Sequence, residues 1–144
     1  MKKVSELLRS KGSGVLSVSP DASVFEAIEL MSTKNVGALL VLKDNKLVGV
    51  ISERDYARKV FLQGRKSKET RVGDIMADKV IYVKPSDSVE YCMALMTDKH
   101  IRHLPVMAED ELVGLVSIGD LVKAVIAEQQ YIIEQLENYI TGNG

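Results

Sequence analysis

The chain contains one long internal repeat, which constrains its fold more than any other feature. Residues 15–60 align with residues 80–125 without a gap, and about a third of the paired positions are identical. A period this long, present only twice, does not fit a solenoid. It predicts two copies of one supersecondary unit that bury their apolar faces against each other, so any groove would occur twice. The identical positions include the pairs Pro20 and Pro85, Gly49 and Gly114, Ser52 and Ser117, and Asp55 and Asp120.

Each copy predicts a β-α-β-β-α unit, which places the chain in the α/β class. A short apolar run that ends at a proline predicts the first strand. The serine three residues later is a candidate N-cap for an amphipathic helix. Two β-rich runs around a polar turn predict a hairpin, and a second helix follows the serine that ends it. The predicted strands are residues 16–18, 38–42 and 47–52 in the first copy and residues 81–83, 103–107 and 112–117 in the second.

The segments outside the repeat divide the chain further. We expect a first repeat with a short leading helix over residues 1–62, a basic connector over 63–71, a second repeat over 72–125 and a helical extension over 126–144. The leading segments VSELL and VGDIM resemble each other, so each copy has one. The extension continues the last helix, and its apolar stripe needs a partner. The residues of this stripe are Ile126, Ile132, Ile133, Leu136 and Ile140.

Composition disfavours several classes of protein. The net charge of −1 and the isoelectric point near 6.1 argue against nucleic-acid binding. No apolar run is long enough to span a membrane, and the first residues lack the apolar core of a signal peptide. The single cysteine, Cys92, suits a reducing compartment. We therefore expect a cytoplasmic protein with no nucleic-acid or membrane partner.

The candidate functional feature is a motif that ends each hairpin. It occurs as LVGVISERD over residues 47–55 and as LVGLVSIGD over residues 112–120. One interpretation is structural, because Ser-x-x-Asp at a helix start forms a capping box. The other is functional. A strand that ends at a helix N-terminus presents N–H groups and the positive end of the helix dipole to a phosphate, and a carboxylate there can accept both hydroxyls of a ribose. Both interpretations fit one motif, and its occurrence at two symmetric places favours the functional one.

No catalytic or metal-binding pattern accompanies the motif. His100 and His103 have a His-x-x-His spacing, but no cysteine or acidic cluster completes a metal site. No Ser-His-Asp, Cys-His or paired-carboxylate arrangement with a plausible spacing is present in the sequence. We therefore expect neither an enzyme nor a metalloprotein.

The two leading segments, the proline turns, IRHLPV at residues 101–106 and the two motif endings, in this order, resemble the CBS domain pair, also called a Bateman module. The resemblance covers almost the whole chain and is closer to small stand-alone CBS-pair proteins of bacteria and plant mitochondria. It implies two adenine-nucleotide clefts between repeats that pack with pseudo-two-fold symmetry. In the family the aspartate of the motif holds the ribose hydroxyls, and this role falls on Asp55 and Asp120.

The resemblance also implies the other residues of each cleft. In the Asp120 cleft they are Leu16, Val36, Gly37, His103 and Ser117. In the Asp55 cleft they are Ala38, Ser52, Ile81, Ile101 and Arg102. Arg54 and Arg58 add guanidinium groups on the Asp55 side, and these suit phosphate oxygens, so we expect the more phosphorylated ligand there. A solvated helix face is the other interpretation of both arginines. The basic residues of the connector either close over a phosphate or form an ordinary surface loop.

The functional expectation is a regulatory module that binds AMP, ADP, ATP or NAD(H) and senses energy or redox state. It would signal through the conformation of a homodimer that the C-terminal helix helps to hold, or through a partner protein. The plant relatives suggest, by analogy alone, a regulated enzyme or a thioredoxin-like protein as that partner. The alternative is a protein-interaction module whose clefts bind no nucleotide, in which case the motifs are only capping boxes.

Overall fold

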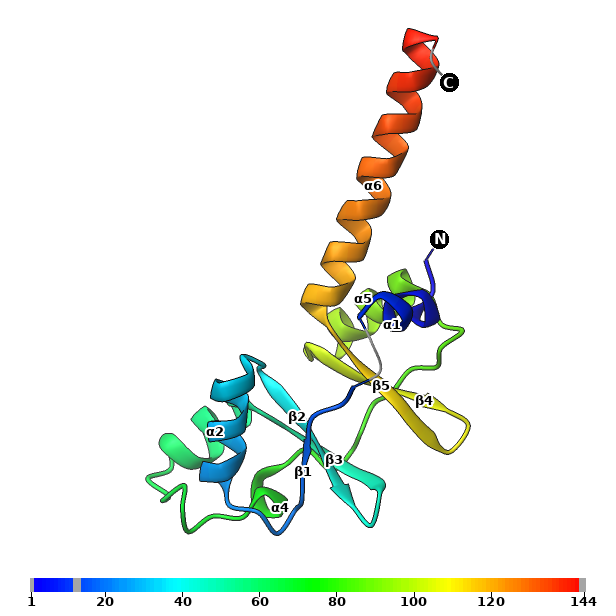
Figure 1. Cartoon of the computed structure of the whole chain (residues 1–144). Helices are drawn as coiled ribbons and strands as arrows, with labels where there is room; N and C mark the ends of the chain where they lie inside the picture. Colours follow the sequence, from blue (N-terminus) through cyan, green and yellow to red (C-terminus); the bar gives the residue numbers. More distant parts are fainter. Residues whose placement is uncertain (1, 12–13, 143–144) are drawn as a thin grey trace. The chain divides into compact units, whose positions relative to one another are not determined.

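The structure is a computed structural model that describes residues 2–11 and 14–142. The chain divides into two compact units, one of residues 14–81 and one of residues 1–13 with 82–144. Each unit combines a small β-sheet with helices (Figure 1). The predicted α/β class with a tandem repeat is confirmed.

The unit of residues 14–81 is built on a three-stranded sheet of order β1-β2-β3. β1 (Ser17–Val18) pairs in parallel with β2 (Ala38–Lys43), which pairs antiparallel with β3 (Lys46–Ser52). The hairpin turns through Asp44 and Asn45, whose φ angles are +53° and +64°. Two successive residues with positive φ are what a tight two-residue hairpin turn requires.

Helices on this sheet bury an apolar core. α2 (Val24–Lys34) begins where Ser23 Oγ accepts a hydrogen bond from the Glu26 N–H, as the N-cap prediction required. Its apolar face packs on the strands together with residues from the segments that follow β3 and the connector. The buried members of this core are Val24, Ala27, Met31, Leu39, Val41, Ile51, Val60, Val72 and Ile75.

The second helix of the first repeat differs from the prediction of one regular α-helix. α3 (Glu53–Tyr56) passes after one turn into the π-helix η1 (Ala57–Phe61). The N–H of Leu62 bonds to the carbonyl of Ala57, five residues earlier, at 3.0 Å. Val60 on this wider turn is buried in the core. π-helical turns are rare and occur often at functional sites, and this one directly follows the Asp55 motif.

The connector is fixed against the start of α2. The N–H of Val24 donates to the carbonyl of Thr70 at 2.8 Å, and the N–H of Phe25 donates to that of Ser67 at 3.0 Å. Thr70 is itself buried, and its hydroxyl donates to the Lys66 carbonyl. The short helix α4 (Val72–Ile75) follows directly. The connector is therefore part of the folded unit.

The other unit contains α1 (Val4–Lys11), α5 (Val89–Lys99) and α6 (Ile118–Thr141) around the antiparallel hairpin of β4 (His103–Ala108) and β5 (Glu111–Ser117). The buried side chains of this unit include Val4, Leu7, Val83, Val89, Cys92, Met96, Leu104, Val106, Val116, Leu121 and Ala124.

The strand expected at residues 81–83 is reduced to a single parallel bridge between Val83 and Val106. In the first repeat the N–H of Leu40 donates to the carbonyl of Leu16 and extends the parallel pairing. The residue equivalent to Leu40 is Pro105, which has no N–H to donate. The missing donor explains why the strand does not extend back to Ile81.

Each leading helix packs on the repeat that it does not precede. α1 comes before the first repeat along the chain, but the N–H groups of Val4 and Ser5 donate to the carbonyls of Asp87 and Pro85, both at 2.9 Å. α4 comes before the second repeat and makes the equivalent pair of bonds, also at 2.9 Å, to the carbonyls of Ala22 and Pro20. The two turns that follow the paired prolines therefore serve as docking points for these helices.

α6 extends well past the other elements of its unit (Figure 1). The last buried residue on it is Ala124, and every residue from 129 to 142 is exposed. The predicted helical extension is thus a continuation of α6 as far as Thr141. No helix in the described part of the chain is long and apolar enough to cross a bilayer.

Candidate functional site

In the unit of residues 14–81, most of the predicted site residues gather where the hairpin ends and the next helix begins. Ala38 is the Cα partner of Ser52 at the end of the β2–β3 ladder. The N–H of Glu53 donates to the carbonyl of Gly37 at 3.0 Å, which fixes the chain just before β2 to the start of α3. The carbonyl of Leu16 accepts a hydrogen bond from β2 nearby. The predicted residues that lie in this region are Leu16, Val36, Gly37, Ala38, Ser52 and Asp55.

The second repeat builds the same arrangement. His103 is the partner of Ser117 at the end of the β4–β5 ladder, and the N–H of Ile118 donates to the carbonyl of Arg102 at 2.9 Å. The predicted residues that lie together here are Ile101, Arg102, His103, Ser117 and Asp120.

Two predicted residues lie outside these groups, and one part of the prediction is untested. Ile81 is in an irregular segment at the end of the unit of residues 14–81, and Arg54 is exposed on α3. Each predicted cleft takes residues from both units, and its assembly stays a prediction.

The Asp55 carboxylate closes a capping box at the start of α3. Its Oδ2 accepts hydrogen bonds from the Ser52 N–H at 2.9 Å and from the Ser52 hydroxyl at 3.0 Å. The N–H of Asp55 donates in return to Ser52 Oγ at 3.2 Å. Lys59, one turn later, places Nζ 3.5 Å from Oδ1. The carboxylate thus satisfies the N–H of Ser52 and keeps a contact with a cation.

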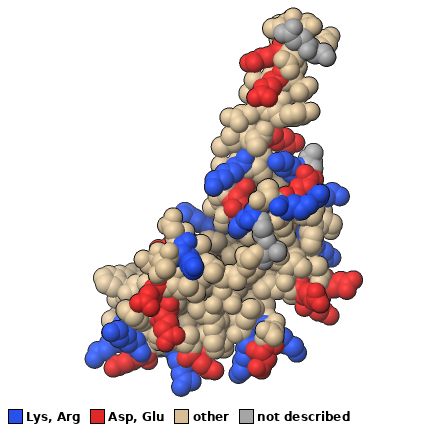
Figure 2. Space-filling view, in the orientation of Figure 1, with Lys and Arg blue, Asp and Glu red and all other residues tan. Residues whose placement is uncertain are grey.

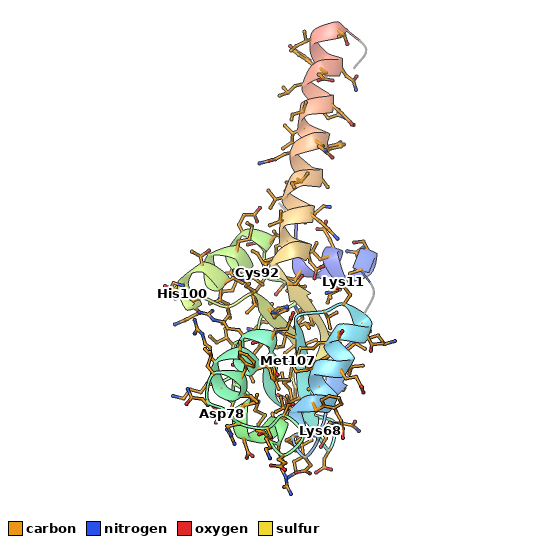
Figure 3. The ribbon with its side chains drawn as sticks, turned by 90° about the vertical axis from the view of Figure 1, so that its left-hand side faces the viewer. Lys11, Lys68, Asp78, Cys92, His100 and Met107 are labelled. Atoms are coloured by element: carbon orange, nitrogen blue, oxygen red, sulfur yellow. The ribbon has the colours of Figure 1, made fainter. Side chains whose placement is uncertain are left out.

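The Asp120 carboxylate forms the same box at the start of α6, but with a cation from a distant part of the chain. Its Oδ2 accepts from the Ser117 N–H at 2.8 Å and from Lys11 Nζ at 2.6 Å. Lys11 lies at the end of α1, beside the start of α6 (Figure 3), and donates also to the carbonyl of Leu115 at 2.8 Å. Burial alone would raise the pKa of Asp120, but the hydrogen bonds from Lys11 and Ser117 outweigh it and hold this pKa below the usual range.

The pKa values of His103 and Asp120 are both affected by the charge of Lys11. Burial lowers the pKa of His103, the charges of Lys11 and Arg102 lower it further, and only Asp120 opposes them. The imidazole is therefore neutral at pH 7 and presents one donor and one acceptor nitrogen.

Beside the Asp55 motif, the unit of residues 14–81 has a basic hollow. It measures about 540 Å³ and lies between η1 and α4. Lys59 joins it to the motif, because its Nζ contacts Asp55 and also donates to the carbonyl of Ile75 at 2.9 Å. Three cationic side chains in one hollow offer a place for an anion. Its lining residues are Arg58, Lys59, Gln63, Arg65, Asp74 and Ile75.

The other basic residues of the connector have local contacts. Lys68 Nζ lies 4.8 Å from the centre of the Phe25 ring, and Arg71 lies 3.8 Å from the carboxylate of Asp21. These contacts match the surface-loop interpretation for Lys68 and Arg71, whereas Arg65 belongs to the basic hollow.

The described residues contain no group of three or more His, Cys, Asp and Glu side chains arranged to hold a metal ion. His100 ends α5 in the left-handed conformation, with φ of +55°. His103 begins β4. The His-x-x-His spacing thus spans a helix end and a strand start.

Lys11 and Lys59 are site residues that the sequence prediction missed. Lys59 follows Asp55 at the i, i+4 spacing typical of helical ion pairs, so a local signal for it exists. Lys11 is 109 positions from Asp120, and no periodicity in the sequence connects them.

Comparison with known proteins agrees with this architecture. The family model for the CBS domain matches twice, at residues 4–61 and 72–127. The mitochondrial CBS domain-containing protein CBSX3 of Arabidopsis thaliana is 44% identical over 148 residues, which cover 96% of this chain and 72% of that protein. A protein with CBS domains from Burkholderia ambifaria MC40-6 has a solved structure that superposes with a TM-score of 0.86 at 50% identity, over 89% of this chain and 96% of that one.

A more distant structure carries ligands. The CBS domain pair of protein MJ0100, solved in complex with 5′-methylthioadenosine and S-adenosyl-L-methionine, superposes with a TM-score of 0.79 over 89% of this chain and 98% of that one. Its sequence identity of 23% shows a common fold only. The matches of the family model, one in each repeat, and the relatives that align over most of the chain show that this protein belongs to the CBS-domain family and carries a tandem CBS pair.

Proposed function

We propose that this CBS pair is a non-catalytic regulatory module that binds an adenine nucleotide, namely AMP, ADP, ATP or NAD(H). Asp55 and Asp120 would accept the ribose hydroxyls. One observation carries the proposal: the same partly exposed carboxylate, with 18% and 21% of its side-chain surface accessible, stands at the first turn of a helix at the end of both hairpins. A carboxylate that is partly open to solvent can accept further hydrogen bonds from a ligand.

The ligands of protein MJ0100 support this choice of chemistry, because both contain adenosine. The ordinary purpose of such binding is to shift a conformational equilibrium, which requires a different affinity for two states. Signalling through a homodimer in the cytoplasm, or through a regulated enzyme or thioredoxin-like protein, follows the same proposal.

The two sites would differ in the ligand they prefer. The basic hollow next to Asp55 favours a ligand with more phosphate there, with Arg54, Arg58 and Arg102 as the expected guanidinium contacts. At Asp120 the carboxylate is already bonded to Lys11. A ribose at that site must share the carboxylate with the ammonium group or displace it.

Calorimetric titration of the full chain tests the proposal. The ligands are AMP, ADP, ATP, NAD⁺, NADH and 5′-methylthioadenosine, and the variants are Asp55→Ala and Asp120→Ala. Each variant should lose one of two binding events or weaken it by about 10- to 100-fold, the cost of a pair of hydrogen bonds to a charged group.

The same substitutions also remove a helix cap, so a matched control is needed. Ser23→Ala and Ser88→Ala remove the caps of α2 and α5, which lie outside the proposed sites. These controls should lower stability and leave binding unchanged. If Asp55→Ala and Asp120→Ala bind every ligand with wild-type affinity and lose only stability, the capping interpretation is the correct one.

The alternative function is a protein-interaction module. Two observations favour it: the capping boxes already give both aspartates a structural role, and the outer part of α6 exposes an apolar surface. The absence of binding by any of these ligands, with an intact fold, would support this alternative.

A further inference from the structure

The outer part of α6 exposes large apolar side chains at a regular spacing. Beyond the last buried residue, Ala124, these side chains are between 48% and 82% exposed. Val122, which precedes Ala124 on α6, is also exposed, at 39%. The exposed apolar residues of this helix are Val122, Ile126, Tyr131, Ile132, Ile133, Leu136, Tyr139 and Ile140.

Five of these residues have the spacing of a coiled-coil seam. Ile126, Ile133 and Ile140 recur every seven residues, as a positions do. The d positions are Val122, Gln129 and Leu136. A heptad of this kind forms a seam in which side chains of a second helix pack as knobs into holes. β-branched residues at a with Leu at d favour two parallel strands, and here all three a positions are Ile while Leu136 fills one of the three d positions.

This seam is distinct from the face that α6 packs on its own unit. Leu121 and Ala124 are buried on that face. Further along, Ala127 and Tyr131 line a hollow together with Lys2 and Glu6. None of these four α6 residues occupies an a or d position, so the fold of one chain leaves the seam uncovered.

The charges on α6 do not oppose its pairing with the same helix of a second copy. No Lys, Arg or His follows Lys123 in the sequence, and the acidic residues beyond it are Glu128, Glu134 and Glu137. Figure 2 shows uncharged and acidic surface on the visible face of the outer helix. The three glutamates occupy c, b and e positions, outside the seam. In a parallel pair, e positions face g positions, which here are Ile132 and Tyr139, so no two glutamates are opposed.

We propose that residues 122–140 of α6 pair in parallel and in register with the same segment of a second copy, as a two-stranded coiled coil. Register is set by Gln129, because in this arrangement its amide meets the same amide of the second copy and both can hydrogen-bond. In the antiparallel arrangement Gln129 would face Ile133, and its amide would be buried without a partner. None of the observations behind this proposal depends on whether the protein binds a nucleotide.

Disulfide trapping in the full chain tests both the partner and the direction. The native Cys92 should not form intermolecular disulfides in this assay, because its side chain is fully buried and burial raises its pKa to about 11. Ile126→Cys, Ile133→Cys and Ile140→Cys place a reactive thiol at three points along the seam. The matched control Gln135→Cys lies on the same helix but outside the seam.

In a parallel pair all three seam variants oxidise to covalent dimers at least about tenfold faster than Gln135→Cys, because equal positions come within disulfide range. Rapid trapping at only one of the three seam positions overturns the proposal, because a parallel pair in register brings all three within range. Trapping no faster than the control overturns it as well.

A second measurement does not depend on oxidation. Ile133→Asp should raise the dimer dissociation constant by about 100-fold in sedimentation equilibrium, because each copy then buries a charge in the seam. Gln135→Asp adds the same charge outside the seam and should leave the constant unchanged. Equal constants for the two variants contradict the proposal, and circular dichroism confirms that both remain folded.

Discussion

Lys11 is the residue that makes the two motif carboxylates unequal. It contacts Asp120 at 2.6 Å, while Lys59 lies 3.5 Å from the carboxylate of Asp55. An ammonium group in that place competes with a ribose hydroxyl for the carboxylate, but it can turn to a phosphate when the ligand carries one. We therefore expect Lys11 to favour nucleotides over nucleosides at the Asp120 site.

Lys11→Met tests this role in the Asp55→Ala background, where titration reports the Asp120 site alone. Affinity for AMP should fall by up to about fivefold, the upper end for a partly exposed ion pair. Affinity for adenosine should stay the same or rise. Lys3→Met removes a charge from the start of the same segment and serves as the control. Equal losses for AMP and adenosine would show that Lys11 only supports the fold.

The Asp120 capping box also predicts a pH dependence of stability. Because the folded-state pKa of Asp120 is held below its usual value by Lys11 and Ser117, against the effect of burial, its contribution is complete above the unfolded-state pKa. It is lost as the pH falls from about 4 through the folded pKa.

Asp120→Asn should therefore cost about 1 kcal/mol at pH 7, the scale of a helix cap, and less at pH 3. Urea unfolding at both pH values measures the difference. Asp98→Asn removes a carboxylate that is 74% exposed and is the matched control. If the cost of Asp120→Asn is as large at pH 3 as at pH 7, the carboxylate is not the stabilising group.

At this scale the sequence predicted what is local and missed what is distant. The capping boxes follow from two residues three positions apart, and both were among the interpretations that the motif allowed. The contact between Lys11 and Asp120 depends on where α1 packs, which no local pattern encodes.

At the scale of elements, two glycines determine how closely the leading helices approach the hairpins. A Cβ on Gly49 would lie 2.5 Å from the sulfur of Met76 and 2.9 Å from the carbonyl oxygen of Ala77. A Cβ on Gly114 would lie 2.6 Å from a methyl group of Leu8. The first contact includes backbone that bridges to β3, while the second involves only the end of a flexible side chain.

Gly49→Ala should consequently destabilise the protein by about 2–3 kcal/mol, as overpacking does. Gly114→Ala should cost less, about 1 kcal/mol, and Leu8→Ala in the same chain should restore part of the loss. Gly14→Ala, which would meet nothing within 4 Å, is the control. Unfolding in urea ranks the variants, and a larger cost for Gly114→Ala than for Gly49→Ala would contradict this account.

The elements themselves were largely predicted, since the repeat and its apolar periodicity define them. Three features were missed. Pro105 lacks the N–H donor that a second parallel strand needs. The helix after Asp55 widens into a π-helical turn. Each leading helix packs on the repeat that it does not precede. The first could have been read from the missing N–H of proline. The other two depend on the register of hydrogen bonds and on packing between segments far apart in the sequence.

At the scale of the whole molecule, α6 connects the two proposals. Its first turn carries Asp120, and its outer turns carry the exposed seam. A ligand that changes the first turn acts on the same continuous helix that would hold a second copy, so ligand binding and dimerisation can be coupled through one element. Such coupling requires the ligand to bind the two states with different affinity.

Truncation after Val125 separates the body of the protein from the seam. No residue beyond 125 is buried in the described chain, so the shorter protein should still unfold cooperatively, with a far-ultraviolet helical signal reduced by the removed turns of α6. It should lose most of the dimer. Because dimerisation raises apparent stability by mass action, the melting temperature of the full chain should rise with protein concentration, and that of the truncated chain should not.

Scanning calorimetry over a hundredfold range of concentration measures this difference, and light scattering gives the mass at each concentration. Removal of residues 141–144 alone leaves every seam position in place and should behave as the full chain does. A truncated protein that keeps the mass of a dimer and the concentration dependence would place the interface on the repeats. The exposed seam of α6 would then be available to another protein, as the interaction-module alternative requires.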